Sequence, residues 1–235
     1  MKKHIVFIAI IIVGFFFSCS KEESEEPAPQ VNEDGLTQEI TDLIPQSIID
    51  EMKSLGMPIY GGNNPPGVEM TYVLSPFVLV ESNRPDDFSP GSIFADIEVK
   101  IYDQNNKDLL TKLEYTTGTE SGIGLNSFIV GNSNNFSVFS EVKLTKNSKN
   151  AQAVYVFSGT LDKENQVVRN AYAANFMLDN NGDDAFFIKD GEGRVFKDDD
   201  EESSIIDFDE GRLFKDNNNI NSPAVPGASM TKVPK

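Results

Sequence analysis

The chain has one histidine, one cysteine and no tryptophan in 235 residues, and the positions of the first two limit its chemistry. His4 and Cys19 both lie in or at the end of an N-terminal segment that has the form of an export signal. Catalysis by Ser-His-Asp or Cys-His groups, and ligation of zinc, iron–sulfur clusters or haem, need an imidazole or a thiol. If the signal is removed, carboxylates, hydroxyls, amides and aromatic rings remain. We therefore predict no catalytic residue and no cofactor.

The N-terminal segment resembles a bacterial lipoprotein signal. Residues 1–3 include two lysines, residues 5–17 form an almost unbroken apolar run, and Ser18 precedes Cys19. The run is shorter than the roughly 20 apolar residues of a membrane-spanning helix. The resemblance implies a signal peptide over residues 1–18 and acyl chains, such as palmitate, on Cys19, where each buried methylene contributes about 0.8 kcal/mol to anchoring. The alternatives are a plain secretory signal or a buried apolar helix with an incidental cysteine.

An acidic segment follows the cysteine, with Lys21 followed by Glu22, Glu23 and two further glutamates. It resembles the export signal of surface lipoproteins of the Bacteroidota, which implies a lipid-anchored outer-membrane protein displayed on the cell surface. The alternative is a solvated tether without a sorting role. Residues 19–35 hold too few apolar side chains to form a core, so we predict a disordered acidic tether there.

The whole chain has a net charge of −17, and removal of residues 1–18 takes away Lys2 and Lys3 and no acid, so 18 basic and 37 acidic residues leave the body at −19. Such an acidic chain repels the phosphates of nucleic acids and anionic lipids. We therefore expect no nucleic-acid partner. The expected partners are the membrane, through the acyl chains on Cys19, a small molecule and a surface protein.

A short amphipathic helix is predicted at the start of one domain that spans residues 36–200. Pro45 suits the first helical position, and Ile49 and Met52 share one face. Gly56 suits the left-handed conformation that ends many helices.

Beyond residue 68 the apolar period changes from helical spacing to two, which is typical of strands with one buried face. Residues 93–102 show this most clearly, with an apolar side chain at every second position. Short polar segments join these stretches, and Asn181-Gly182 is the strongest two-residue turn signal among them. We predict eight strands: 68–74, 93–102, 109–117, 125–131, 136–145, 152–161, 167–178 and 185–197.

An antiparallel meander of eight strands hides its edges by closing into an up-and-down barrel, so we predict an all-β fold of this kind. The order of short helix, first strand, long connection over residues 75–92 and seven further strands resembles lipocalin-like (calycin-like) barrels. That resemblance implies that the long connection lies across the open end. Residues 70–72 stand where the true lipocalins have Gly-x-Trp, which this chain lacks. The alternative is an open β-sandwich.

Three segments, residues 56–60, 64–66 and 75–80, further resemble a family of Bacteroidota lipoproteins. This resemblance implies location and fold, and it implies no active site.

An acidic, asparagine-rich tail over residues 201–235 is predicted to be largely disordered. It contains Gly-Arg-Leu-Phe-Lys-Asp at 211–216, which repeats Gly-Arg-Val-Phe-Lys-Asp at 193–198. The repeat fits two equivalent strand ends, one binding motif shown twice, or chance.

An eight-stranded barrel is either filled by side chains or holds one small ligand. The acidic segments at 179–184 and 198–202 lack EF-hand spacing, so no metal site is predicted. We predict a non-catalytic lipoprotein that binds a small apolar or sugar-like ligand. The alternatives are a structural or protein-interaction role with a solid barrel, and a carboxylate-dependent accessory protein of glycoside hydrolysis. The candidate ligand-binding residues are aromatic: Tyr72, Tyr102, Tyr115, Tyr155, Phe157, Tyr172 and Phe176.

Overall fold

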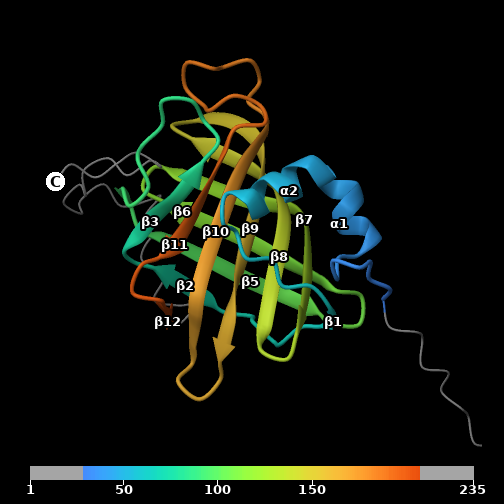
Figure 1. Cartoon of the computed structure of the whole chain (residues 1–235). Coiled ribbons are helices and arrows are strands. Elements are labelled where there is room, and N and C mark those ends of the chain that lie inside the picture. Colours follow the sequence, from blue (N-terminus) through green and yellow to red (C-terminus); the bar gives the residue numbers. More distant parts are fainter. Residues whose placement is uncertain (1–28, 207–235) are drawn as a thin grey trace, which may run out of the picture.

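The computed structural model describes residues 29–206 (Figure 1). Cys19, Lys21, Glu22, Glu23 and the second copy of the hexapeptide repeat lie outside the described residues. The elements in chain order are α1 Gln38–Leu43, α2 Gln46–Ser54, β1 Asn63–Asn64, β2 Thr71–Leu74, β3 Phe77–Ser82, β4 Ile93–Phe94, β5 Ile97–Asn105, β6 Leu110–Thr117, β7 Glu120–Asn132, β8 Asn135–Lys146, β9 Lys149–Asp162, β10 Val167–Asp179, β11 Gly193–Asp198 and β12 Glu202–Ile206.

Within the described residues the strands belong to one sheet, and its hydrogen bonds run in a closed ring. Strands β5 to β10 pair consecutively and antiparallel, as the meander predicts. The ring closes because β12 pairs with β10 on one side and with β2 on the other, while β2 pairs with β5. The two-residue β1 is the parallel exception, beside the end of β7. The prediction of an antiparallel all-β fold is confirmed at this level.

Strand β10 pairs with two different strands along its length. Additional strands therefore continue the sheet beside one end of the ring. Residues Val167–Arg169 pair with β12, and after a register shift Tyr172–Phe176 pair with β11. Strand β11 pairs in turn with β3, and β3 with β4. The sheet therefore includes residues beyond 200, where the tail was predicted to begin.

Two sequence predictions are wrong at this end of the molecule. Residues 75–92 are not one long connection, because Phe77–Ser82 form β3, whose Phe77 and Leu79 are buried and whose backbone pairs with β11. The last predicted strand does not begin at residue 185. It begins at Gly193, because Phe186 and Phe187 pack from a loop onto the interior cluster. Asn181 and Gly182 both adopt positive φ, as the turn signal predicts, but they begin the longer connection 180–192.

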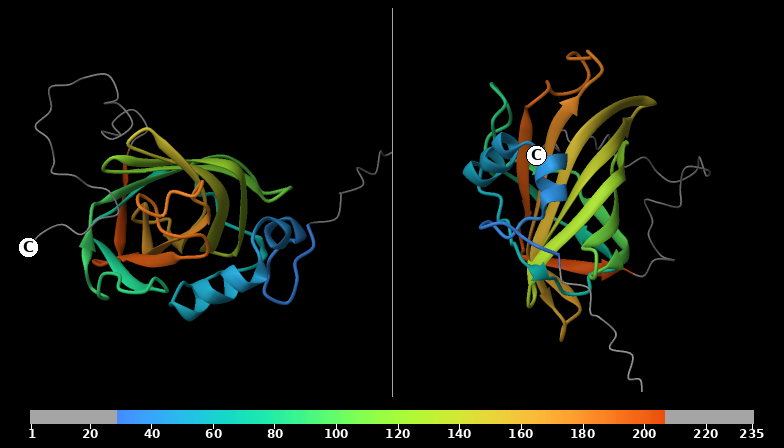
Figure 2. Two further views of the ribbon diagram at one scale, coloured as in Figure 1. Left: turned by 90° about the horizontal axis from the view of Figure 1, so that it is seen from above. Right: turned by 90° about the vertical axis from the view of Figure 1, so that its right-hand side faces the viewer.

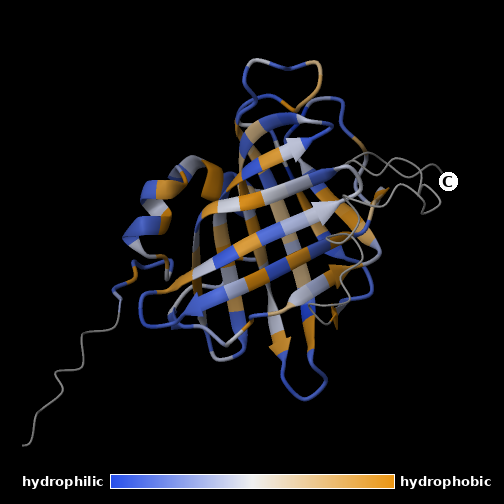
Figure 3. Cartoon of the chain, turned by 180° about the vertical axis from the view of Figure 1, so that it is seen from behind, coloured by the Kyte–Doolittle hydropathy of each residue, from blue (hydrophilic) through white to orange (hydrophobic). Residues whose placement is uncertain are grey.

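The apolar residues form two clusters on the two faces of the sheet. Large side chains fill the interior of the ring, including the stacked pair Phe77 and Phe196, whose centroids lie 4.5 Å apart. Tyr72 and Phe157 pack against each other in the same interior, with centroids 5.6 Å apart. Hydrophobic and hydrophilic residues alternate along the strands (Figure 3), which is the pattern expected when each strand has two different faces.

The second cluster fixes the helices to the outside of the ring (Figure 2, left). Helix α2 is confirmed close to its predicted bounds: Pro45 precedes it, Ile49 and Met52 are buried, and Gly56 has a φ of +91°. Helix α1 was not predicted; Thr37 caps it by accepting a hydrogen bond from the backbone N–H of Ile40. In the part of the chain described, no helix is long and apolar enough to cross a membrane.

The ordered domain begins before residue 36, within the segment predicted as tether. The side chain of Asn32 accepts hydrogen bonds from the backbone N–H groups of Asp34 and Leu36. The carbonyl of Gly35 accepts from the N–H of Gly62 at 2.8 Å.

Candidate ligand-binding site

A cavity of about 270 Å³ lies at one end of the ring, and we call it the mouth cavity. Four connections meet at this end: the turns after β6 and β8, and the loops 83–92 and 180–192. The second loop crosses the opening when the ring is viewed end-on (Figure 2, left). The volume is slightly below the usual range for drug-sized ligands, about 300–1,000 Å³, so the space suits a ligand of about one ring.

Strand register brings four polar side chains together on the floor of the mouth cavity. Glu120 lies directly opposite Lys146 across β7 and β8, and Asn175 lies directly opposite Arg194 across β10 and β11. Directly paired residues of antiparallel strands present their side chains on the same face. All four line the cavity, so carboxylate, ammonium, amide and guanidinium groups converge there.

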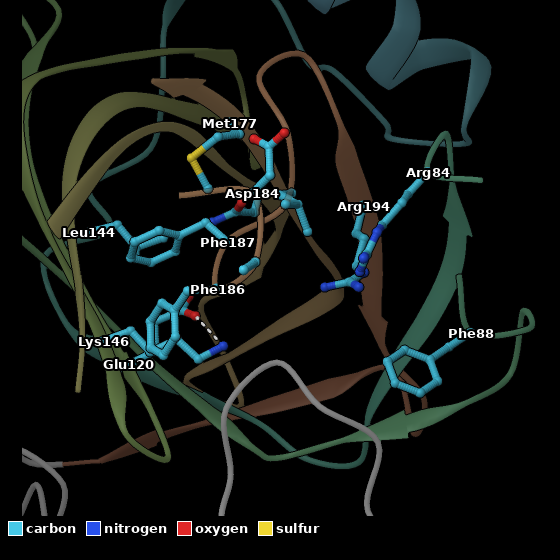
Figure 4. Close-up of a pocket in the computed structure, with 13 residues that line it drawn as sticks. Arg84, Phe88, Glu120, Leu144, Lys146, Met177, Asp184, Phe186, Phe187 and Arg194 are labelled. Carbon is cyan, nitrogen blue, oxygen red and sulfur yellow. Dashed lines mark ion pairs between the residues drawn. The ribbon is translucent and has the colours of Figure 1, made fainter. Parts of the chain in front are cut away.

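Glu120 is the carboxylate of this floor and is only 4% exposed. Its Oε1 accepts a hydrogen bond from the Tyr115 hydroxyl at 3.1 Å, and Lys146 Nζ lies 3.9 Å from Oε2 (Figure 4). Burial raises the pKa of Glu120, while Lys146, Tyr115 and Arg194 oppose that rise. Burial also raises the pKa of Tyr115, and the neighbouring Glu120 adds to it.

Two buried polar atoms beside the cavity have no hydrogen-bond partner within residues 29–206: Asn175 Nδ2 and the hydroxyl of Tyr155. These residues lie directly opposite each other across β10 and β9, and both are at least 97% buried. The Asn175 amide lies close enough to the Tyr115 hydroxyl to lower its pKa through a hydrogen-bonding interaction, although Nδ2 falls outside normal hydrogen-bond geometry. An unpaired buried polar group costs about 1–3 kcal/mol, so folded proteins pair almost all of them. A ligand in the cavity would supply a partner for Asn175, which lines it.

Ion pairs tie the two loops of the mouth to the sheet. Arg194 makes two hydrogen bonds of 2.7 Å to the carboxylate of Asp87, and both side chains are buried. Burial alone would raise the pKa of Asp87, but hydrogen bonds from Arg194 and Ser82 lower it to about 2. Arg84 lies 3.5 Å from Glu192. These contacts fix loop 83–92 against β11 and against loop 180–192.

Aromatic side chains form the walls of the mouth cavity. Phe186 and Phe187 lie on one side of it and Phe88 on the opposite side, next to Arg194 (Figure 4). The rings of Phe186 and Phe187 meet edge to face, with centroids 4.9 Å apart. Lys149 Nζ lies 4.5 Å from the centroid of Phe186. The cavity thus combines a polar floor with apolar walls, which is the usual composition of small-molecule sites.

The seven aromatic residues predicted to bind a ligand do not line this cavity. Four of them are buried in the interior, and of these Tyr115 and Tyr155 lie directly behind the polar floor, stacked with centroids 4.5 Å apart. Phe176 and Tyr172 belong to the cluster on the outer face, and Tyr102 is partly exposed beside Glu114. The interior four are Tyr72, Tyr115, Tyr155 and Phe157.

Sequence reasoning did not identify the lining residues. One signal was present: Asn175 interrupts an otherwise apolar strand of alanines, Phe176 and Met177, where a buried amide needs a partner. Arg194 is the second residue of the first hexapeptide copy, which is β11. No group of three or more His, Cys, Asp or Glu side chains that could hold a metal ion occurs in residues 29–206.

Comparison with protein-family models, with curated proteins and with solved structures gave no significant match. The fold and the cavity therefore define the class: an antiparallel β protein whose closed ring of strands has a ligand-sized cavity at one end.

Proposed function

We propose that this protein is a lipid-anchored protein of the cell envelope that binds one small molecule in the mouth cavity and catalyses no reaction. The observation that carries the proposal is Asn175 Nδ2, an unpaired donor buried in the lining of a ligand-sized cavity, with the unpaired Tyr155 hydroxyl in the layer directly behind it. A protein that bound nothing there would gain stability by replacing both with apolar groups of the same shape.

The proposed architecture is a lipocalin-like barrel. The closed ring of antiparallel strands, the helical segment before the first strand and the loop 83–92 at the open end support it. The interior behind the mouth cavity is filled by aromatic side chains, so a ligand in this cavity stays at the mouth.

The binding proposal is tested by native mass spectrometry of the full acylated chain, purified from its own cells in a detergent without a sugar headgroup. We expect a co-purified mass on the wild type that is lost in Leu144→Phe, which fills the cavity. The matched control is Leu161→Phe, another buried leucine of the interior cluster that does not line the cavity. A wild-type protein that carries no small molecule would contradict the proposal.

The anchoring proposal rests on the resemblance of the N-terminal segment to a lipoprotein signal. We expect Cys19→Ala to abolish metabolic labelling with a radioactive fatty acid; unchanged labelling would contradict acylation at this residue. Surface display predicts that protease added to intact cells degrades the domain. The triple replacement of Lys21, Glu22 and Glu23 by Ala should protect it from the protease without reducing acylation.

One feature favours the alternative of a protein-interaction role. Ile123 and Leu125 lie two residues apart on β7 and are 56% and 51% exposed. If the mass spectrum contained a second polypeptide that dissociates when both residues are replaced by Ser, this alternative would replace small-molecule binding.

A further inference from the structure

The mouth cavity also indicates the chemical class of its occupant. We propose that the ligand is a neutral ring that carries several hydroxyl groups, of the size of one sugar residue. This inference rests on the proposed binding function and extends it from an unspecified small molecule to a class.

The first argument is the balance of donors and acceptors on the floor. Of the lining groups, Asn175 Nδ2 can only donate and the Glu120 carboxylate accepts. A hydroxyl group is both a donor and an acceptor. Adjacent hydroxyls on one ring can therefore accept from Asn175 and donate to Glu120 at the same time.

The second argument is charge. Each cationic side chain that lines the cavity already has a carboxylate partner: Arg194 pairs with Asp87, Arg84 with Glu192 and Lys146 with Glu120. An anionic ligand would lie beside Glu120, and a cationic ligand would lie beside Arg194 and Lys146. Because each lining cation is compensated, and the remaining lining carboxylate, Asp184, accepts a hydrogen bond from Asn180, the site favours a ligand without net charge.

The third argument excludes a long acyl chain. Such a chain would cover the polar floor without offering hydrogen bonds, and Asn175 and Tyr155 would stay unpaired. The stacked rings of Tyr115 and Tyr155 lie behind the floor, and Phe157 and Tyr72 fill the interior beyond them. An extended chain therefore finds the interior occupied.

The walls fit the apolar faces of a sugar ring. Phe88 and Phe186 lie on opposite sides of the cavity (Figure 4), where the C–H groups of a ring can pack against them while its hydroxyls reach the floor. The volume of about 270 Å³ leaves room for one ring, so the ligand is a monosaccharide or a terminal residue of a glycan.

The test is calorimetric titration of the full chain, in a detergent without sugar headgroups, with single probes. The sugars are glucose, galactose, mannose, fucose and N-acetylglucosamine; the contrasting probes are benzoate, benzylamine and dodecanoate. We expect at least one sugar to bind with saturation and the contrasting probes not to compete. Asn175→Leu should weaken binding of that sugar by about tenfold, the value of one lost hydrogen bond.

The matched control is Tyr72→Phe, because Tyr72 is an equally buried tyrosine of the same interior whose hydroxyl donates to the carbonyl of Val68. It should leave sugar affinity unchanged. Binding of a contrasting probe in place of the sugars, or binding of no sugar, would overturn the inference about class. The binding function itself would fail only if the native mass spectrum showed no small molecule, so the two failures are distinguishable.

Discussion

Tyr72 and Tyr155 are both fully buried in the interior of the ring, but they belong to regions with different polar pairing. At Tyr72 the hydroxyl donates to a carbonyl at 2.9 Å. At Tyr155, next to the mouth cavity, the hydroxyl has no partner within the described residues, and neither has the amide of Asn175 opposite it. The core region uses its hydrogen bonds for stability. The mouth region leaves bonds unmade where a ligand can complete them, at a cost to the stability of the free protein.

The largest contrast is expected from aromatic truncation. Phe196 is fully buried, stacked on Phe77 and in edge contact with Phe94. Phe196→Ala should lower the free energy of unfolding by about 3–5 kcal/mol, measured by urea denaturation. Phe186→Ala, at the partly exposed wall of the cavity, should lower the free energy of unfolding much less. Equal losses would mean that the mouth is packed as tightly as the core.

A smaller but substantial effect is expected at the ion pair of the mouth. Asp87→Ala leaves Arg194 buried without its partner, which costs about 3–5 kcal/mol in other proteins. We expect the free energy of unfolding, measured by urea denaturation, to fall by about 3 kcal/mol, because Arg194 keeps contacts with the rings of Phe88 and Phe94. The control is Asp162→Ala, which breaks the more exposed pair with Arg169. A loss at Asp87 as small as at Asp162 would contradict the role of the buried pair.

The pH dependence of this pair follows from the lowered pKa of Asp87. The folded pKa of about 2 lies below the ordinary value near 3.8, so the stabilisation is fully present above about pH 4. It is lost as the pH falls through 2. The difference in stability between wild type and Asp87→Ala should therefore be constant from pH 5 to 7 and shrink in stronger acid.

Removing the hydroxyl of Tyr72 or of Tyr155 tests most directly whether the core and the mouth differ in polar pairing. Tyr72→Phe should reduce the free energy of unfolding by about 1–2 kcal/mol, because the Val68 carbonyl loses its donor. Tyr155→Phe should leave the stability of the ligand-free protein unchanged or raise it slightly. Thermal denaturation of both variants measures the difference. A destabilised Tyr155→Phe would show that its hydroxyl serves the fold.

The smallest effect is expected at Asp198, where β11 ends between the two regions. Burial raises the pKa of this carboxyl to about 6, although Ser203 and the Ser75 N–H donate hydrogen bonds to it. Because its pKa is higher in the folded state, the Asp198 carboxyl contributes most to stability below pH 3.8, and that contribution is lost as the pH rises through 6. Asp198→Asn should therefore be slightly more stable than the wild type at pH 7.5 and should flatten that pH dependence.

Much of the fold could be predicted because its signals are local. Alternation with period two gave the strands from β5 to β10, and Pro45 and Gly56 gave the bounds of α2. The elements that were missed are short: α1, β1, β3 and β12. Strand β3 has an apolar run without alternation, and its strand conformation depends on pairing with β11, more than a hundred residues away.

The candidate site was less predictable, because aromatic residues in strands occur on both faces of the sheet. Phe176 and Asn175 are neighbours in the sequence, yet one packs under the helices and the other lines the cavity. Nothing near Glu120 in the sequence indicates that it meets Arg194 and Asn175. These residues come from three strands, and only the register of each pairing places their side chains on one floor.

The sequence by itself determined the antiparallel strands, the buried face of α2, the acidity and the absence of imidazole beyond residue 4, since each of these depends on residue type and local spacing. The tertiary structure alone decided that the ring closes through β12, that large side chains fill the interior behind the mouth cavity, and that a buried amide remains unpaired in the lining of that cavity. The physical reason is that closure and register are set by hydrogen bonds between distant segments, and a cavity is the space that those pairings leave.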